Sequence, residues 1–324
     1  MIKVGIVGYG NLGKGVTLAV SKASDMECVG IFTRRDPSAL NPIVNYPVYS
    51  MEKLSDFKGE IDVLLLCGGS ATDLPNNTAN LLKDFNTVDS FDTHAKIPEY
   101  YDKLEKVAKE NGTLSAISIG WDPGVFSIAR MLFGAVLPDG NDYTFWGKGV
   151  SQGHSDAIRR IEGVKNAIQY TIPKEEALSA VRSGQNPKLS TRDKHLRECF
   201  VAVDDGADKS AIEKAIKEMP NYFADYDTIV NFVSEEEVRS MQQKLSHGGF
   251  VFRSGNTTKE NAHLLELSLK LDSNPEFTGS VLVAYGRAVA KMAKEGKTGV
   301  VTVFDVPIKY LSPLTNEDLR KTLL

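Results

Sequence analysis

The chain of 324 residues has few of the residue types that build disulfide scaffolds and metal centres. Its three cysteines, Cys28, Cys67 and Cys199, lie far apart, and its five histidines occur singly. This pattern argues against a disulfide framework and against a cysteine- or histidine-based metal site. It fits a protein of the reducing cytoplasm, and we expect no bound metal.

Long apolar runs and a strong charge imbalance are also missing. No apolar stretch reaches the ~20 residues that span a bilayer, and the first residues lead straight into an apolar run, without the basic segment of a secretory leader. A net charge of −4 gives no indication of a nucleic acid or an anionic membrane as a partner. We therefore expect a cytoplasmic protein that acts on a small molecule.

The N-terminal segment carries a dinucleotide-binding turn. Ile2–Val7 is an apolar, β-branched run that is typical of a buried parallel strand, and G-x-G-x-x-G follows it directly. Gly8 allows the tight turn, Gly10 lets a pyrophosphate approach the backbone, and Gly13 lets the next helix pack on the strand. Free N–H groups at that helix start bind phosphate. This context favours a cofactor site over a glycine-rich turn without a ligand.

The end of the second expected strand, 26–32, indicates which cofactor is bound. An NAD-specific site places Asp or Glu there for the ribose 2′-OH. This chain has Thr33, Arg34 and Arg35 instead. A hydroxyl and two guanidinium groups suit a 2′-phosphate, so we expect NADP(H). The alternative is that both arginines are solvated surface residues.

The strand and helix pattern divides the chain near residue 120. Residues 1–120 are predicted to form a Rossmann domain, an α/β fold with a doubly wound parallel sheet. Residues 121–324 are predicted to form an α+β domain with a mainly antiparallel sheet. Its last expected strand, 264–271, alternates leucine with polar residues, so its own helices or a second subunit must cover one face. A helix near 276–294 is expected to pack back on the first domain.

Polar residues follow the expected strands of the parallel sheet, at the carboxyl ends where such folds bind ligands. They lie in Cys67–Ser70, Ser90–Asp92 and Gly120–Gly124. Asp92 and Asp122 could hold a substrate ammonium group or accept its proton. Helix or turn capping is the alternative for each, since Asp122 precedes a Pro-Gly pair.

The second part of the chain has three candidate features. Trp146–Asp156 combines an aromatic side chain with glycines and short polar residues, which suits a shaped pocket. A loop that caps a helix after Ser151 explains it too. Arg197, in an expected strand, could bind a substrate carboxylate or form a structural ion pair. His247 stands alone at an expected loop, where a structural role is the ordinary one.

Together these motifs resemble the diaminopimelate dehydrogenase family. Residues 9–13, 32–35, 69–73, 120–124, 145–147, 151–156 and 247–249 carry the resemblance, which extends from Met1 to about Pro313. It implies reversible NADPH-dependent oxidative deamination of meso-2,6-diaminopimelate at its D-centre. The products are L-2-amino-6-oxopimelate and ammonia, in lysine biosynthesis. The resemblance also implies a homodimer, whose second domain binds substrate and forms the dimer.

The resemblance assigns two sets of residues. Beside Gly8 and Gly13, the cofactor would meet Tyr9, Gly10, Asn11, Leu12, Thr33, Arg34, Arg35, Cys67, Gly68, Gly69, Ser70, Ser90, Phe91, Asp92, Ile119, Gly120, Trp121, Asp122 and Pro123. The substrate would meet Asp92, Asp122, Trp146, Ser151, Gln152, Gly153, Thr171, Arg197, His247 and Asn274. Asp92 and Asp122 are the expected catalytic residues. Another NADP-dependent dehydrogenase of the same pathway and a non-catalytic NADPH sensor are the alternatives.

Overall fold

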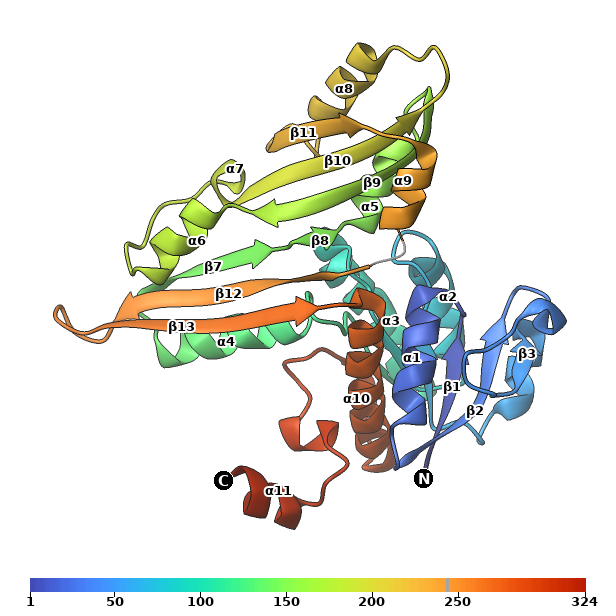
Figure 1. Cartoon of the computed structure of the whole chain (residues 1–324). Coiled ribbons are helices and arrows are strands. Elements are labelled where there is room, and N and C mark those ends of the chain that lie inside the picture. The colour runs from blue at the N-terminus through green and yellow to red at the C-terminus, as the bar shows by residue number, and fades with distance from the viewer. Residues whose placement is uncertain (243–244) are drawn as a thin grey trace. The chain divides into compact units, whose positions relative to one another are not determined.

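The computed structural model describes residues 1–242 and 245–324, except the side chain of Gln152. The chain forms two compact units (Figure 1): unit 1 comprises Met1–Ile128 and Pro275–Leu324, and unit 2 comprises Ala129–Asn274. The observed division thus differs from the boundary expected at residue 120, because residues 121–128 and 275–324 make their contacts within unit 1. Within the described ranges, no helix is long and apolar enough to cross a membrane.

Unit 1 is built on a seven-stranded parallel sheet in the order β14-β6-β5-β4-β1-β2-β3. The strands are β1 (Ile2–Val7), β2 (Met26–Thr33), β3 (Val48–Ser50), β4 (Val63–Leu66), β5 (Thr87–Asp89), β6 (Leu114–Ala116) and β14 (Gly299–Val301). The order runs outward from β1 on both sides, which confirms the predicted doubly wound sheet. Strands β3 and β14, each of three residues, were not predicted from the sequence.

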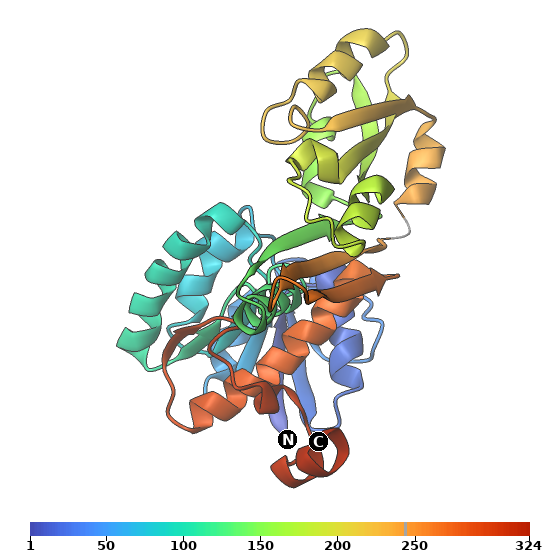
Figure 2. The same cartoon turned by 90° about the vertical axis from the view of Figure 1, so that its left-hand side faces the viewer.

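Helices cover both faces of this sheet (Figure 2). They are α1 (Asn11–Ser21), α2 (Asp73–Leu81), α3 (Ile97–Asn111) and α10 (Asn274–Lys294). Unit 1 also contains α11 (Asn316–Leu323) and 3-10 turns at Pro37–Ala39, Met51–Phe57, His94–Lys96 and Ile308–Leu311. Residues of α1 and α10 share one core with β1, and residues of α2 and α3 share the other core with β4. The backbones of α1 and α10 touch, since a Cβ on Gly15 would lie 2.4 Å from the carbonyl oxygen of Pro275.

Unit 2 contains two sheets, not one. A four-stranded sheet has the order β11-β10-β9-β8, and a three-stranded sheet has the order β13-β12-β7. The strands are β7 (Gly140–Trp146), β8 (Gly149–Val150), β9 (Val164–Pro173), β10 (His195–Val203), β11 (Asp227–Phe232), β12 (His247–Asn256) and β13 (Ala262–Leu271). All pairs are antiparallel except β10 with β11, so the predicted mainly antiparallel character is confirmed. Strand β12 begins at His247, so the expectation that this residue lies in a loop is wrong.

Six helices complete the described part of unit 2. They are α4 (Val125–Val136), which enters from unit 1, α5 (Gln152–Arg159), α6 (Glu175–Arg182), α7 (Thr191–Lys194), α8 (Lys209–Lys217) and α9 (Glu235–Met241). Apolar residues of α5 and α8 pack on one face of the four-stranded sheet, and Val238 of α9 packs on the other. Residues of α6 pack on one face of the three-stranded sheet. Each sheet therefore has a core of its own.

Candidate active site

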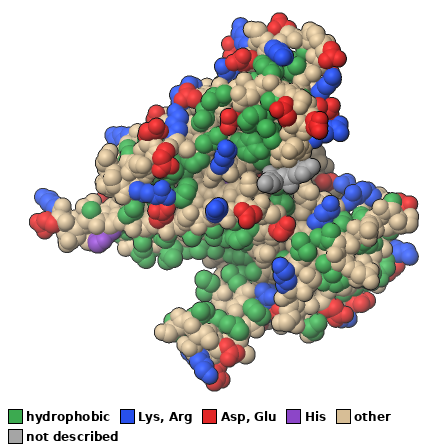
Figure 3. Space-filling view, in the orientation of Figure 1, with side chains coloured by type: hydrophobic (Ala, Val, Ile, Leu, Met, Phe, Trp, Pro, Cys, Tyr) green, Lys and Arg blue, Asp and Glu red, His purple; other side chains and the backbone are tan. Residues whose placement is uncertain are grey.

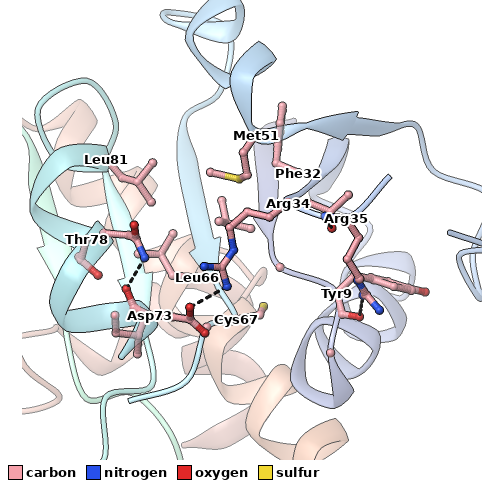
Figure 4. A pocket seen from close by; sticks show the side chains of 17 residues that line it. Tyr9, Phe32, Arg34, Arg35, Met51, Leu66, Cys67, Asp73, Thr78 and Leu81 are labelled. Carbon is pink, nitrogen blue, oxygen red and sulfur yellow. Dashed lines mark hydrogen bonds and ion pairs between the residues drawn. The ribbon is translucent and has the colours of Figure 1, made fainter. Parts of the chain in front are cut away.

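A cavity of about 490 Å³ lies in unit 1 at the carboxyl ends of β1, β2 and β4 (Figure 4). Eight residues predicted for the cofactor line it: Gly8, Tyr9, Gly10, Thr33, Arg34, Arg35, Cys67 and Gly68. The rest of the wall was not assigned from the sequence: Val7, Phe32, Met51, Leu66, Asp73, Leu74, Asn77, Thr78 and Leu81. Most of these additional residues are apolar and look like ordinary core residues in the sequence.

The glycine turn leaves room for a phosphate. A Cβ on Gly13 would lie 2.2 Å from the carbonyl oxygen of Gly8, so the helix start can approach the strand end only without a side chain. A Cβ on Gly10 would meet nothing within 4 Å, so the space beside this residue is open. No side chain caps the start of α1 at Gly10. The first turn of α1 therefore presents N–H groups to a ligand.

The two arginines lie at this cavity with different partners. The Arg35 backbone N–H donates to Thr33 Oγ1 at 3.1 Å, and its guanidinium donates to the Tyr9 carbonyl. Arg34 is largely exposed and donates to Asp73 Oδ1 at 2.7 Å. Asp73 also accepts from the Gly69 N–H at 3.1 Å, which fixes the carboxylate beside Arg34. Two cations against one carboxylate leave a positive balance, which fits a 2′-phosphate.

The other predicted cofactor residues do not line this cavity. Asn11, Leu12 and Gly13 lie in the first turn of α1, and residues 90–92 and 119–123 follow β5 and β6. The Asp92 N–H donates to Ser70 Oγ at 3.1 Å, which joins the segment after β5 to the segment after β4. Asp92 is exposed, whereas Asp122 is half-buried in a turn closed by a bridge between Trp121 and Gly124. Both aspartates belong to unit 1.

Arg197 of β10 is a buried cation in unit 2, with 6% of its surface exposed. It is paired in register with Thr171 of β9 and donates to the Thr171 hydroxyl. Its guanidinium carbon lies 3.9 Å from the centre of the Tyr226 ring. Across residues 1–242 and 245–324, no carboxylate forms an ion pair with Arg197, and its Nε has no hydrogen-bond partner. The structural ion pair considered from the sequence is therefore not observed.

The environment of Arg197 suits an anionic ligand. Burial lowers the pKa of this guanidinium, because the charged form loses its hydration. A buried charge without a counter-ion is unfavourable, and a carboxylate with fork geometry would satisfy it. Among the described residues of this unit, four further buried polar atoms lack a partner: Gln169 Oε1, Asn186 Oδ1, His195 Nδ1 and Thr228 Oγ1.

Trp146, at the end of β7, is held by His195, a histidine not predicted from the sequence. The backbone N–H of Trp146 donates to Nε2 of His195 at 2.8 Å, and the two rings stack with centres 5.3 Å apart. His195 is fully buried, and burial together with the Arg197 charge lowers its pKa to about 3. A neutral imidazole is therefore a fixed acceptor that orients Trp146. A single histidine in an expected strand gave no signal for this role.

The remaining predicted substrate residues are spread over three elements. The Ser151 hydroxyl caps α5, accepting from the His154 N–H at 3.5 Å and bonding to His154 Nδ1 at 2.6 Å, as in the capping alternative. Gly153 is exposed on α5, and the side chain of Gln152 lies outside the described part. The His247 Nδ1 accepts from the Gly248 N–H at 2.8 Å. The Asn274 N–H donates to the carbonyl of Leu245 at 2.8 Å.

The doubly wound sheet, the glycine turn at a helix start and the two arginines define an oxidoreductase of the NADP-dependent dehydrogenase class. The family model described as the diaminopimelic acid dehydrogenase C-terminal domain matches residues 120–273. The chain is 56% identical over 323 residues to the meso-diaminopimelate D-dehydrogenase of Ureibacillus thermosphaericus, covering 100% of this chain and 99% of that relative.

Solved structures agree with this relationship. A meso-diaminopimelate dehydrogenase variant from Clostridium tetani with DAP is 52% identical, with a TM-score of 0.96 and 100% of both chains covered. An engineered D-amino acid dehydrogenase bound to NADP⁺ is 41% identical, with a TM-score of 0.88 over 100% of this chain and 99% of that chain. The chain belongs to the meso-diaminopimelate D-dehydrogenase family.

Proposed function

We propose that this enzyme catalyses the reversible NADP-dependent oxidative deamination of meso-2,6-diaminopimelate at its D-centre. The products are L-2-amino-6-oxopimelate and ammonia, and the step serves lysine biosynthesis. One observation carries the proposal beyond the family relationship. Arg197 is a buried guanidinium without a carboxylate partner among the described residues, as a site for a dicarboxylate substrate requires.

The cofactor site is proposed to follow the segments predicted from the sequence. The turn from Gly8 to Gly13 would hold the pyrophosphate, and Thr33, Arg34 and Arg35 would hold the 2′-phosphate. The segments 67–70, 90–92 and 119–123 would hold the nicotinamide half. When bound, NADP⁺ accepts the hydride, and NADPH returns it in the reverse reaction.

The substrate residues are proposed to divide between the two ends of diaminopimelate. Arg197 and Thr171, with His247 and Asn274, would bind the ammonium and carboxylate of the L-centre, which does not react. Trp146, Ser151, Gln152 and Gly153 would complete the pocket. Binding the L-centre in one orientation selects which hydrogen of the substrate can leave, so these residues would account for attack at the D-centre.

Asp92 and Asp122 are proposed to act on the amino group of the D-centre. The C=N bond forms only when nitrogen has a free lone pair, so the ammonium must first lose a proton. One aspartate would accept this proton, directly or through water, and the other would keep the nitrogen in place. After Cα has lost its hydride, water attacks the imine carbon, and ammonia leaves as the keto group of the 2-oxo acid forms.

A homodimer is proposed to form over the face of the three-stranded sheet that lies opposite α6. Leu265, Leu267 and Leu269 of β13 point away from α6, since the residues between them pair with the strand positions that pack on that helix. Arg130 of α4 donates to Thr144 of β7 at 3.3 Å, which places α4 on this same face.

The face formed by α4 and these leucines is apolar. Met131, Leu132 and Val136 of α4 are 50%, 50% and 60% exposed. Figure 3 shows hydrophobic side chains gathered along this part of unit 2. A second copy of the chain would cover a patch of this kind. We also propose a cytoplasmic location, which the three free cysteines support.

The function is tested by following NADPH formation with the separate stereoisomers of diaminopimelate. We expect oxidation of the meso isomer and none of the LL isomer, and an enzyme inactive on the meso isomer would overturn the proposal.

Asp92→Ala and Asp122→Ala should each lower kcat at least 100-fold, roughly the share of a general base, with little change in NADPH affinity. Asp84→Ala is the control, because Asp84 is a surface carboxylate that pairs with Lys58 at 2.8 Å.

A further inference from the structure

A buried carboxylate lies three residues before Asp92 and has no part in the reaction described so far. Asp89 is the last residue of β5, and none of its surface is exposed. Its Oδ1 accepts from the N–H of Phe91 at 3.0 Å and from the N–H of Ser118 at 3.2 Å. Its carbonyl oxygen accepts from the N–H of Ile119 at 2.8 Å.

These bonds join the two segments that carry the proposed acid–base pair. Phe91 directly precedes Asp92, and Ser118 and Ile119 lead to Asp122. Ser118 has φ of +59°, a left-handed conformation that a serine adopts only when its surroundings hold it there. One carboxylate oxygen therefore fixes the backbone after β5 and the backbone after β6 at the same time.

We propose that Asp89 is a positioning residue that sets the two segments bearing Asp92 and Asp122, an inference that rests on the proposed function. It acts through backbone N–H groups and does not itself touch the substrate. The other oxygen of the carboxylate extends the arrangement, because Oδ2 accepts from the Tyr100 hydroxyl at 2.9 Å, and that hydroxyl lies 2.8 Å from Oγ1 of Thr78. Thr78 lines the cofactor cavity.

The charge of Asp89 allows a test of whether this residue positions the two segments or only fills space in the core. Burial raises its pKa to about 6, while the hydrogen bonds from Phe91, Tyr100 and Ser118 oppose that shift. The carboxylate is thus ionised at neutral pH, although the described residues include no cation paired with it. Tyr100 of α3 is the titratable group in contact with it, and its ring stacks on Phe91 at 4.2 Å. Bonds from N–H groups to a charged oxygen are about twice as strong as bonds to a neutral one.

Asp89→Asn isolates the charge, because an asparagine satisfies the same neighbours. Its oxygen can accept from both backbone N–H groups, and its nitrogen can donate to the Tyr100 oxygen, whose hydroxyl then donates to Thr78. The protonated wild-type carboxyl offers the same set of bonds. The positioning role therefore predicts that wild type and Asp89→Asn differ at high pH and converge as the pH falls through about 6.

The experiment measures kcat for meso-diaminopimelate from pH 5 to pH 9, with NADPH affinity measured by fluorescence. At pH 8 we expect Asp89→Asn to lower kcat roughly 3- to 10-fold, as weaker hydrogen bonds imply, and the ratio to wild type should approach one at pH 5. Asp89→Ala should lower kcat further, and NADPH affinity should stay within about 3-fold in both variants. Asp62→Asn is the control, since Asp62 accepts from the Lys3 N–H at 2.8 Å before β4, at the opposite end of the sheet.

Each outcome decides the proposal. A ratio of wild type to Asp89→Asn that is the same at every pH overturns the role of Asp89, and so does wild-type kcat in Asp89→Asn at pH 8. If Asp89→Ala does not fold, the pH dependence of the asparagine variant still decides. A wild-type enzyme that is inactive on meso-diaminopimelate overturns the proposed function first, which separates the two failures.

Discussion

Replacing Arg197 with methionine should separate substrate binding from stability. The change removes the guanidinium and keeps a side chain of similar length. A fork of two charge-assisted hydrogen bonds to a carboxylate contributes about 3–5 kcal/mol. We therefore expect kcat/KM for meso-diaminopimelate to fall about 10²- to 10⁴-fold, with NADPH affinity unchanged because the cofactor cavity lies in unit 1.

The stability of the same variant should hardly change. Methionine loses the bond to Thr171 and the contact with the Tyr226 ring, each about 1 kcal/mol. It also removes a desolvated charge that has no ion-pair partner among the described residues, which offsets that loss. The expected change in the free energy of unfolding is within about 1 kcal/mol of zero.

Arg253 supplies the matched control in the same unit. It is 7% exposed and donates to Asp142 at 2.9 Å and to the carbonyl oxygens of Leu137 and Pro138. Arg253→Met leaves these acceptors unpaired, and we expect a loss of about 2–3 kcal/mol, reduced by the partial exposure of Asp142. Urea unfolding and initial rates of NADPH formation measure both variants. If Arg197→Met were as destabilising as Arg253→Met, or left KM unchanged, the reasoning about Arg197 would be wrong.

Three further predictions concern the cofactor, the buried carboxylate and assembly. Combining Arg34→Ala with Arg35→Ala should weaken NADP⁺ roughly 100-fold and NAD⁺ less than 3-fold, by the loss of charge-assisted bonds to the 2′-phosphate; equal losses in a fluorescence titration would refute the phosphate assignment. Folding raises the pKa of Asp89 from 3.8 to about 6, so the folded state favours the protonated carboxyl group. The stability gained from this protonated group is complete below pH 3.8 and is lost as pH rises through about 6. The free energy of unfolding of Asp89→Asn, measured in urea, should therefore rise by about 3 kcal/mol relative to that of wild type between pH 4 and pH 7.5. A difference between the two proteins that stays constant with pH would contradict this. In sedimentation velocity, Leu267→Lys should yield monomers, whereas Ser268→Lys on the opposite face should not; an intact Leu267→Lys dimer would place the interface elsewhere.

Local signals made most of the parallel sheet predictable. Buried apolar runs and the glycine turn identify β1, β2 and β4 without knowledge of the rest of the chain. Strands β3 and β14 have three residues each and exist because they pair with β2 and β6. Their formation depends on distant partners, so no local pattern indicates them.

Prediction of the candidate active site has the same limit, because some of its contacts depend on residues far apart in the sequence. Arg34 and Arg35 were predictable because a strand end is a local feature, but the fold alone brings Asp73 to Arg34. His195 likewise meets Trp146 only because β10 and β7 are brought together in unit 2. Strand β12 was missed because His247 is followed by two glycines, which lower strand propensity, while its neighbours β7 and β13 hold it in place.

The insertion of unit 2 within unit 1 has a consequence for synthesis on the ribosome. Helix α10 and strand β14 are translated only after all of unit 2, yet they cover β1 and extend the sheet beside β6. Until they emerge, of the two helices α1 and α10 only α1 covers the apolar face around Val4 and Ile6, so the nascent N-terminal part is exposed to aggregation. A fragment cut at residue 128 would keep that defect, whereas a fusion of residues 1–128 to 275–324 retains every strand of the parallel sheet.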